Sequence, residues 1–483
     1  MTSQLLTDCL NEIIEHLKED CHTLHSCLLV NRLWCEISVR ILWRNIGNFE
    51  SSCQSIINSS ILNTLFTCLP NESKEILHRN EIFISIPISK QPLFNYAKFC
   101  KALSIYEIGR LVDNIFRNKI SFNSLSLKDR NYIVTNEFIK MFSNQISSLK
   151  KLSCYHNYYP IKFSFPYFPG VRDLSELHCC SCLPPNFFYQ LSQLCHNLRT
   201  LSIDFDSYNI SNELKELISL QKNLKNLKLS AKISSCASII PTLKKHSNTV
   251  TKLHLYGNSN NLPYSFVSSF TNLQEFIFSF MGGSNFEDFR MLQYVNFSKL
   301  QTLKIPYQFP KPEYLMKFLE NNGKNLKNFY TDESNKDLSL SIPDFCPNLK
   351  SLFLLFHKDE LDALKTIFIK CQHLESIKVW CGKGYFNEYL SEKEIFDTVA
   401  RYSPNNFCKL KIYSLSNSHV SLKDLESFFI SWRKRIPKKP LSLINIKGAC
   451  TSFDDYEENM KIIIAVFELL GSLLSIGSLV FNK

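Results

Sequence analysis

Apolar residues recur along the chain in a phrase of six residues, with leucine or a similar side chain at the first and fourth positions. In the copy LRTLSI at residues 198–203, Leu201 and Ile203 alternate with Ser202. This period of two predicts a short strand that points Leu201 and Ile203 to one face and Ser202 to the other. We call each copy a rung. Rungs begin at residues 149, 174, 198, 224, 250, 273, 300, 326, 349 and 374.

The spacing of the rungs indicates the fold. Successive starts lie roughly 25 residues apart, a period typical of leucine-rich repeats. The segments between rungs show helical spacing, as in residues 213–220 and 315–319. A single strand with its return helix cannot bury its apolar face, whereas stacked neighbours share one continuous core. The sequence therefore predicts an α/β solenoid with a parallel sheet on the concave face and helices on the convex face. Further rungs are predicted at residues 122–127, 407–412 and 441–446.

The chain begins with a different pattern. Residues 7–44 predict three short helices, the first carrying Leu10, Ile13 and Ile14 at helical spacing and the third capped by Asn31. Residues 46–120 are helical but less regular, as is typical of the end of a repeat array.

Two motifs in the first segment carry a family resemblance. The run LLVNRLW at residues 28–34 and the pair Leu42-Trp43 make the segment similar to an F-box. The whole chain resembles F-box proteins with leucine-rich repeats, especially an expanded family of arbuscular mycorrhizal fungi in which phrases like FFISW (428–432) and NNGKNL (321–326) recur. The F-box usually opens with Leu-Pro. Here Leu6 replaces the proline, which removes its fixed backbone angle.

The resemblance implies a division of the chain and a function. It implies an F-box at residues 1–45, a helical linker and cap at 46–120, repeats at 121–450 and a tail at 451–483. It implies a non-catalytic substrate receptor of an SCF-type ubiquitin ligase, binding a Skp-family adaptor and through it a cullin, with no cofactor and no oligomer of its own. The residues predicted to contact the adaptor are Leu5, Leu6, Leu10, Ile13, Leu28, Val30 and Trp34. Alternatively, the internal core of the three helices is formed by four of these residues: Ile13, Leu28, Val30 and Trp34.

Composition narrows the class of protein. Of the 483 residues 45% are hydrophobic and 20% charged, which is typical of a chain that folds. The net charge of +11 is spread out, with one tight cluster at residues 433–439, and this distribution does not favour nucleic-acid binding. The N-terminus has no long apolar segment of the secretory kind, and 18 cysteines then indicate reduced thiols and a cytoplasmic or nuclear location.

A cluster of cysteines and histidines suggests a metal, but the repeat explains it. Cys179 and Cys182 have the C-x-x-C spacing of zinc ligands, and Cys195 and His196 follow. Cys179 nevertheless occupies an inward strand position, and Cys195 precedes its rung as Cys346 and Cys371 precede theirs. We predict no metal site. The sequence also contains no phosphate loop, nucleophile elbow or zinc-protease motif, so no catalytic site is predicted.

The fifth residue of each rung, which lies between the two apolar strand positions, should face the open side of the sheet. Lysines in this column are equally well explained as a solvated face, whereas exposed aromatic residues are typical of interfaces. We therefore predict a surface that binds a protein client. It is formed by Lys304, Tyr330, Phe353 and Lys378 of this column and by Trp380 beside it.

The last segment departs from the rest. Residues 462–481 are almost uncharged and long enough to span a bilayer, although Glu468 and several Ser and Gly residues oppose this. We expect an apolar capping end here rather than a membrane anchor. Two other functions stay open: an interaction scaffold that no longer engages a ligase, and a tail-anchored membrane receptor.

Overall fold

The computed structural model divides into two compact units, Met1–Leu224 and Lys225–Lys483, which we call the N-terminal and C-terminal units. The residues described are 7–18, 20–46, 54–82, 92–117, 126–154, 165–206, 209–231, 234–257, 263–280, 287–307, 310–333, 335–383, 388–414, 422–435, 440–447 and 461–466.

The N-terminal unit begins with three helices, as predicted: α1 (Thr7–Glu15), α2 (Cys21–Cys27) and α3 (Arg32–Leu42). Side-chain oxygens cap two of them, since Oδ1 of Asp20 accepts the N–H of Thr23 and Oδ1 of Asn31 accepts that of Trp34, each at 3.0 Å. The three helices share a small core of their own. It contains Leu10, Ile14, Leu24, Ile37 and Ile41, with Leu17, Leu33, Trp34 and Leu42 packed against it.

The remainder of the N-terminal unit introduces the sheet. Its strands pair in parallel and in sequence order: β1 (Asn45–Ile46), β2 (Ala102–Ser104), β3 (Lys151–Cys154), β4 (Glu176–Cys180) and β5 (Thr200–Asp204). Its other helices are α4 (Gln54–Cys68), α5 (Asn71–Arg79), α6 (Tyr96–Phe99), α7 (Ile105–Arg117), α8 (Leu127–Gln145), the 3-10 helix η1 (Pro169–Asp173), α9 (Pro185–Leu194) and α10 (Asn212–Ser219).

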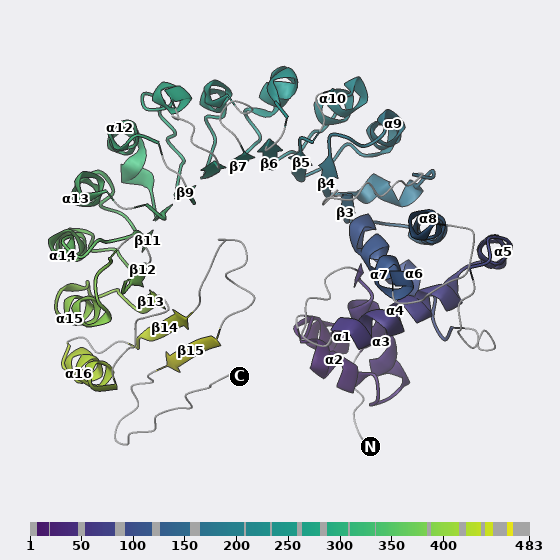
Figure 1. The fold of residues 1–483 in the computed structure, drawn as a ribbon, viewed down its shortest axis with the longest axis horizontal. Helices are drawn as coiled ribbons and strands as arrows, with labels where there is room; N and C mark the ends of the chain where they lie inside the picture. The colour runs from purple at the N-terminus through teal and green to yellow at the C-terminus, as the bar shows by residue number, and fades with distance from the viewer. Residues whose placement is uncertain are drawn as a thin grey trace. The chain divides into compact units, whose positions relative to one another are not determined.

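The C-terminal unit continues the same pattern. Its parallel strands pair in sequence order, and in Figure 1 they line the inner side of the unit while α12–α16 cover the outer side. The strands are β6 (Asn226–Ala231), β7 (Lys252–Gly257), β8 (Glu275–Phe280), β9 (Thr302–Ile305), β10 (Asn328–Thr331), β11 (Ser351–Phe353), β12 (Ser376–Cys381), β13 (Lys409–Ser414) and β14 (Ser442–Lys447). A final strand, β15 (Lys461–Val466), pairs antiparallel with β14.

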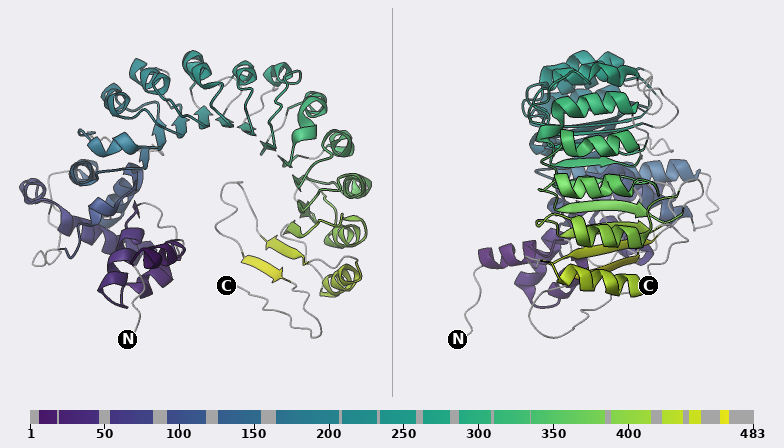
Figure 2. Two further views of the ribbon diagram at one scale, coloured as in Figure 1. Left: turned by 180° about the vertical axis from the view of Figure 1, so that it is seen from behind. Right: turned by 90° about the vertical axis from the view of Figure 1, so that its left-hand side faces the viewer.

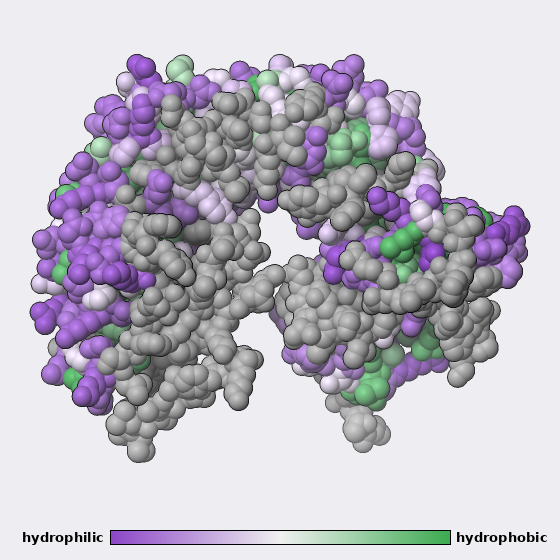
Figure 3. Space-filling view, in the orientation of Figure 1, coloured by the Kyte–Doolittle hydropathy of each residue, from purple (hydrophilic) through white to green (hydrophobic). Residues whose placement is uncertain are grey.

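The returns between these strands are helical, and Figure 2 shows the later ones stacked side by side. The α-helices are α11 (Ile240–Leu243), α12 (Pro312–Asn322), α13 (Lys336–Phe345), α14 (Leu361–Lys370), α15 (Glu392–Tyr402) and α16 (Leu422–Arg433). The 3-10 helices are η2 (Ala237–Ile239), η3 (Lys244–His246), η4 (Tyr264–Ser269), η5 (Glu287–Met291) and η6 (Gly323–Asn325). The outward surface over α12–α16 is mostly hydrophilic (Figure 3).

The core lies between strands and returns. In β7, Leu253 and Leu255 are fully buried, whereas Lys252, His254 and Tyr256, which alternate with them along the strand, are not. The first leucine of each rung, such as Leu300, Leu326 or Leu349, is likewise fully buried. The fold is thus an α/β leucine-rich-repeat solenoid preceded by three helices, which confirms the predicted fold class.

One predicted rung is wrong. Residues 122–125 lie outside the described residues, but Ser126 caps α8 through its Oγ and Leu127 begins that helix. The strand next to β3 is β2, with Leu103 opposite Leu152. The pair Leu125 and Leu127 resembles a rung in spacing, but Ser126 and Asp129 form a helix start, and Ser126 Oγ also donates to Asp129 at 2.6 Å. β2 therefore falls in the segment that the sequence assigned to a helical linker, and β1 crosses the start of that segment, while the boundary at residue 121 stays a prediction.

The apolar segment predicted at 462–481 is partly described. Its first residues belong to β15, and residues 467–481 lie outside the described residues. Within the described part of the chain, no helix has the length and apolar character needed to cross a membrane.

In two of the repeats, a buried amide ties the end of a helix to the preceding repeat. The side chain of Asn322, at the end of α12, accepts the N–H of Phe297 at 2.7 Å and donates to the carbonyls of Val295 (2.9 Å) and Phe318 (3.0 Å). Gly323 follows, and a Cβ there would lie 2.6 Å from both Cys346 Sγ and Phe345 O. Asparagine and glycine are thus both required by this close approach of one repeat to the next.

Gln221 has the same role in the N-terminal unit. Its Oε1 accepts the N–H of Leu198 at 3.0 Å, and its Nε2 donates to the carbonyls of Cys195 and Leu217, each at 2.8 Å. Two different amides thus satisfy backbone groups at or just before the first leucine of a rung in two repeats.

We expect Asn322→Leu to destabilise the chain by about 2–4 kcal/mol, because the N–H of Phe297 would be buried without a partner and the partly buried carbonyl of Val295 would also lose its donor. Urea unfolding of the full chain measures this change. Glu320→Ala on the exposed face of the same helix is the control, with an expected effect within about 0.5 kcal/mol. Equal stability of the two variants would show that the amide does not brace the repeat.

Candidate functional site

The residues predicted to contact an adaptor separate into surface and core. Ile13 and Val30 are 50% and 56% exposed, Leu28 and Trp34 are half-buried, and Leu5 and Leu6 lie outside the described residues. Leu10 is only 3% exposed within the three-helix core, which corrects the prediction that it lies on the surface. Its place in the stripe with Ile14 already points inward, since positions four apart share a helix face.

The turn between α2 and α3 presents further apolar surface. Leu29 is 89% exposed beside Val30, and sequence reasoning missed it. The turn is held at both ends, by the N–H of Leu28 on the carbonyl of Leu24 (3.3 Å) and by the Asn31 cap of α3. Two large apolar side chains in a fixed turn form a surface that an apolar partner would cover.

The predicted client residues form one column across the C-terminal unit. The parallel register places Lys304 opposite Tyr330, Tyr330 opposite Phe353, and Phe353 opposite Lys378. This alignment follows from the rungs, because the same position in each rung faces the same side of the sheet. Trp380, two residues after Lys378, stands opposite Tyr413 in β13.

Lys378 is the centre of this group. Its Nζ donates a hydrogen bond to Tyr330 Oη at 2.9 Å and lies 4.3–5.1 Å from the ring centroids of Tyr330, Phe353 and Tyr413. A cation over several aromatic faces is attracted by each ring. We call Tyr330, Phe353, Lys378, Trp380 and Tyr413 the lysine–aromatic cluster.

The rings of the cluster also pack on one another. The centroids of Tyr330 and Phe353 are 4.3 Å apart, and Trp380 stacks on Tyr413 at 5.9 Å. Phe353 is only 1% exposed, which corrects the prediction that it is exposed. Tyr330 and Lys378, on the two adjacent strands, cover its side chain. A single sequence does not predict such burial by neighbouring strands. Lys304, Tyr330, Lys378 and Trp380 are half-buried.

The sequence did not predict Tyr413, because the predicted column ended at the rung of Lys378. It lies two positions after Lys411 in the rung FCKLKI, as Trp380 lies two after Lys378. Extending the same alignment by one rung would have found it. With Tyr413 the cluster spans four neighbouring strands, β10 to β13.

A carboxyl group lies just beyond the end of β10. Burial raises the pKa of Asp332 to about 7, although the backbone N–H of Tyr307 favours its charged form and so opposes this. Tyr307 has φ = 70°, a left-handed backbone that a tyrosine rarely adopts. Among the described residues, Asp332 Oδ1 is buried with no hydrogen-bond partner. Such a carboxyl exchanges its proton near neutral pH.

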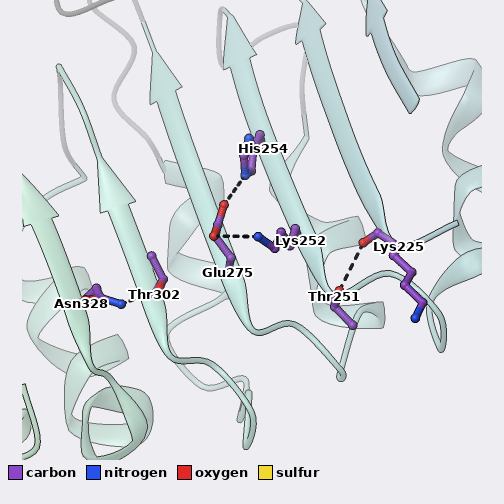
Figure 4. Close-up of polar contacts among 7 residues, drawn as sticks. All are labelled: Lys225, Thr251, Lys252, His254, Glu275, Thr302 and Asn328. Atoms are coloured by element: carbon purple, nitrogen blue, oxygen red, sulfur yellow. Dashed lines mark hydrogen bonds and ion pairs between the residues drawn. The ribbon is translucent and has the colours of Figure 1, made fainter. Parts of the chain in front are cut away.

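A second polar group lies on the strand face at β7 and β8. Nε2 of His254 lies 2.6 Å from Oε1 of Glu275, and Nζ of Lys252 lies 3.5 Å from Oε2 (Figure 4). The hydrogen bond from His254, aided by the charge of Lys252, holds the pKa of Glu275 at about 2. On the next strands, Asn328 Nδ2 donates to Thr302 Oγ1 at 3.0 Å (Figure 4).

The N-terminal unit contains a similar arrangement. His178 Nε2 lies 2.5 Å from Glu176 Oε1 and Lys151 Nζ 2.9 Å from the same oxygen. The hydrogen bond from His178 is the main cause that lowers the pKa of Glu176 to about 2, with Lys151 adding to it. In both places a carboxylate lies between a histidine and a lysine, so its charge is matched within the group.

The cysteines are mostly core thiols. Cys195, Cys346 and Cys371 are buried at the ends of the returns, and burial raises the thiol pKa of Cys195 and Cys371 to about 12. Cys180 and Cys182 are joined by a disulfide, which corrects the prediction that every thiol is reduced. Over the part of the chain that the structure describes, no group of three or more His, Cys, Asp or Glu side chains is arranged to hold a metal.

No protein-family model matches the sequence, and a comparison with curated proteins finds no match either. Two solved structures are similar to this chain. The crystal structure of the Rad7 and Elc1 complex in yeast has 11% sequence identity and a TM-score of 0.38, covering 87% of this chain and 97% of that one. That of an internalin (inlF) from Listeria monocytogenes has 12% identity and a TM-score of 0.29, covering 71% of this chain and 95% of that one.

The pKa of Glu275 gives a prediction about acid stability. A carboxyl whose pKa is lower in the folded chain stabilises the fold above its ordinary value of 4.5, and this contribution disappears as the pH falls towards 2. We expect Glu275→Gln to cost about 0.5–1.5 kcal/mol at pH 7, after allowance for solvent screening, and less at pH 3. Urea unfolding at the two pH values measures the difference. Glu313→Gln, at an exposed position of α12, should show no such change. A cost of Glu275→Gln that is the same at both pH values would contradict the assignment.

Proposed function

We propose that this chain is a non-catalytic substrate receptor of an SCF-type ubiquitin ligase, acting in the cytoplasm or nucleus. The three helices bind a Skp-family adaptor, which links the chain to a cullin, and the repeats hold a protein client. The chemistry then belongs to other subunits, and this chain contributes position.

The observation that carries the proposal is the apolar surface of the three-helix unit. Leu29 and Val30 protrude from the turn between α2 and α3, and Ile13 is half-exposed on α1, although the unit has its own core to fill. Large exposed apolar residues on so small a helical unit favour a partner protein. These residues belong to the stretch whose sequence resembles an F-box. We therefore assign the adaptor contact to Ile13, Leu28, Leu29, Val30 and the half-buried Trp34, together with Leu5 and Leu6.

The client surface is assigned to the lysine–aromatic cluster with Lys304. Half-buried Tyr330 and Trp380 are held by ring contacts and by the hydrogen bond from Lys378. Aromatic side chains that are already ordered lose little conformational entropy when a partner binds, which favours their use as anchors.

A second candidate is an interaction scaffold that binds a client without a ligase. The observation that favours it is Leu6 in the place where the family usually has proline. The variant Leu6→Pro distinguishes the two candidates. If it binds the adaptor and the natural chain does not, the loss of adaptor binding is due to this one substitution.

We expect the full chain to bind the host's Skp-type adaptor, and the double variant Leu29→Asp, Val30→Asp to weaken binding by about tenfold or more, because two carboxylates would be buried without partners. Calorimetric titration of the full chain measures the dissociation constant. Leu93→Asp is the matched control, since Leu93 is 79% exposed and lies outside the three helices.

Adaptor binding that the double variant leaves unchanged would contradict the assigned contact at Leu29 and Val30. No binding by the natural chain or by Leu6→Pro would contradict the ligase proposal itself. Binding by Leu6→Pro alone would favour the scaffold.

The client surface has its own prediction. Replacing Tyr330 and Trp380 with alanine should remove co-purifying proteins that the natural chain retains, because the anchors are lost. Quantitative mass spectrometry of the complexes purified with each variant measures this. Tyr294→Ala, Tyr402→Ala is the control, since both tyrosines are exposed in the same unit, at 71% and 37%. The same proteins with both variants would rule out the cluster as the client site.

A further inference from the structure

A basic groove runs along the edge of the C-terminal unit where β9, β10 and β11 begin. It is open to solvent and has a volume of about 400 Å³. It lies at the starts of the strands, whereas the lysine–aromatic cluster lies on their face. Its lining residues are Ser298, Lys299, Gln301, Lys324, Asn325, Lys327, Asn348, Lys350 and His373.

The repeat brings these lysines together. Lys327 and Lys350 follow the first leucine of their rungs, and Lys299 precedes the first leucine of its own. The N–H of Lys327 bonds to Gln301 O and that of Lys350 to Lys327 O, each at 2.8 Å, so the backbone fixes the spacing of neighbouring rungs. Adjacent strands lie about 4.8 Å apart, which keeps successive lysines close.

The charges of the groove are poorly compensated. Lys350 pairs with Glu375 at 2.7 Å, but the partner of Lys299 within the described part of the chain is the neutral Asn272, also at 2.7 Å. Among the described residues, neither Lys324 nor Lys327 has a carboxylate partner, and all four lysines are exposed. Grouped charges of one sign repel each other and attract an ion of the opposite sign.

Lysines on the outer helices of the same unit differ. Lys311, Lys317 and Lys365 pair with Glu287, Glu320 and Asp362, at 2.7, 2.8 and 3.1 Å. These three lysines are thus matched with carboxylates, whereas three of the four groove lysines, Lys299, Lys324 and Lys327, have no carboxylate partner among the described residues. This contrast within one unit is the reason to assign the groove a ligand.

The lining also indicates the class of ligand. It contains no phenylalanine, tyrosine or tryptophan, so it lacks the stacking surface on which proteins hold single-stranded nucleic acid. It also presents no large apolar side chain that would enter a bilayer. Lysine ammonium groups and the amides of Gln301 and Asn325 are suitable donors for several separate anionic groups along an extended chain.

We propose that this groove binds an acidic segment of a partner protein, with carboxylate or phosphate groups seated among Lys299, Lys324, Lys327 and Lys350. The site is independent of the adaptor contact and of the lysine–aromatic cluster. Binding is electrostatic, so it weakens as salt is added.

Fluorescence anisotropy of the full chain at low ionic strength tests the proposal. The probes are a labelled octapeptide of alternating glutamate and serine, its phosphoserine form, and a glutamine form without charge. We expect saturable binding of one or both charged peptides and none of the glutamine form. The tighter of the two charged peptides identifies the anionic group.

Two matched triple variants locate the site. Lys299→Ala, Lys324→Ala, Lys327→Ala should weaken peptide binding about tenfold or more, while Lys311→Ala, Lys317→Ala, Lys365→Ala removes the same charge elsewhere and should change it by about twofold at most. Equal weakening by both triples would overturn the proposal, because net charge alone would then explain binding. It is likewise overturned if neither charged peptide binds, or if a thymidine dodecanucleotide or phosphatidylserine vesicles bind through the same lysines more tightly than both peptides. None of these outcomes bears on adaptor binding.

Discussion

Each strand of this protein can bury its leucines only because another strand lies beside it. A rung such as that of Leu300 and Leu303 has too little surface to form a core, and both residues are fully buried because the neighbouring rungs and the return helices enclose them. The backbone follows the same constraint, since the N–H of Lys327 and that of Lys350 each bond to the preceding rung. Where the returns approach most closely, Asn322 and Gly323 complete the contact. The lysine–aromatic cluster and the groove at the strand starts are consequences of this stacking, whereas the apolar turn between α2 and α3 belongs to a separate helical core.

The sequence predicts the repeated part of the fold well, because each rung carries its own period of two. The strands at residues 151, 176, 302 and 376 lie where the phrases place them. The phrase at residues 122–127 fails because a local signal competes with the pattern: Ser126 and Asp129 begin a helix. Periodicity also cannot separate α from 3-10 returns, and the segments after β7 and β8 prove to be 3-10 helices, η4 and η5.

The site is predicted less completely. The alternation of inward and outward residues along each strand predicts the column of Lys304, Tyr330 and Lys378. It does not predict how side chains on neighbouring strands cover one another. Phe353 is buried by its neighbours for that reason. The carboxylate of Glu275 and the histidine it binds come from different strands, so only the register brings them together. Leu10 and Ile13 belong to one helix, yet one fills the core and the other faces solvent. Such differences depend on distances across the fold, which a single sequence does not contain.

The position of Lys378 has a consequence for selectivity. Its ammonium group already occupies the space between the rings of Tyr330, Phe353 and Tyr413, where the positive group of a ligand would otherwise be attracted. A partner that offers its own lysine or a methylated ammonium would first have to displace this internal cation and would gain little by the exchange. Neutral and anionic groups meet no such competition. At the proposed client surface, the cluster therefore disfavours cationic ligands, because Lys378 already supplies the cation.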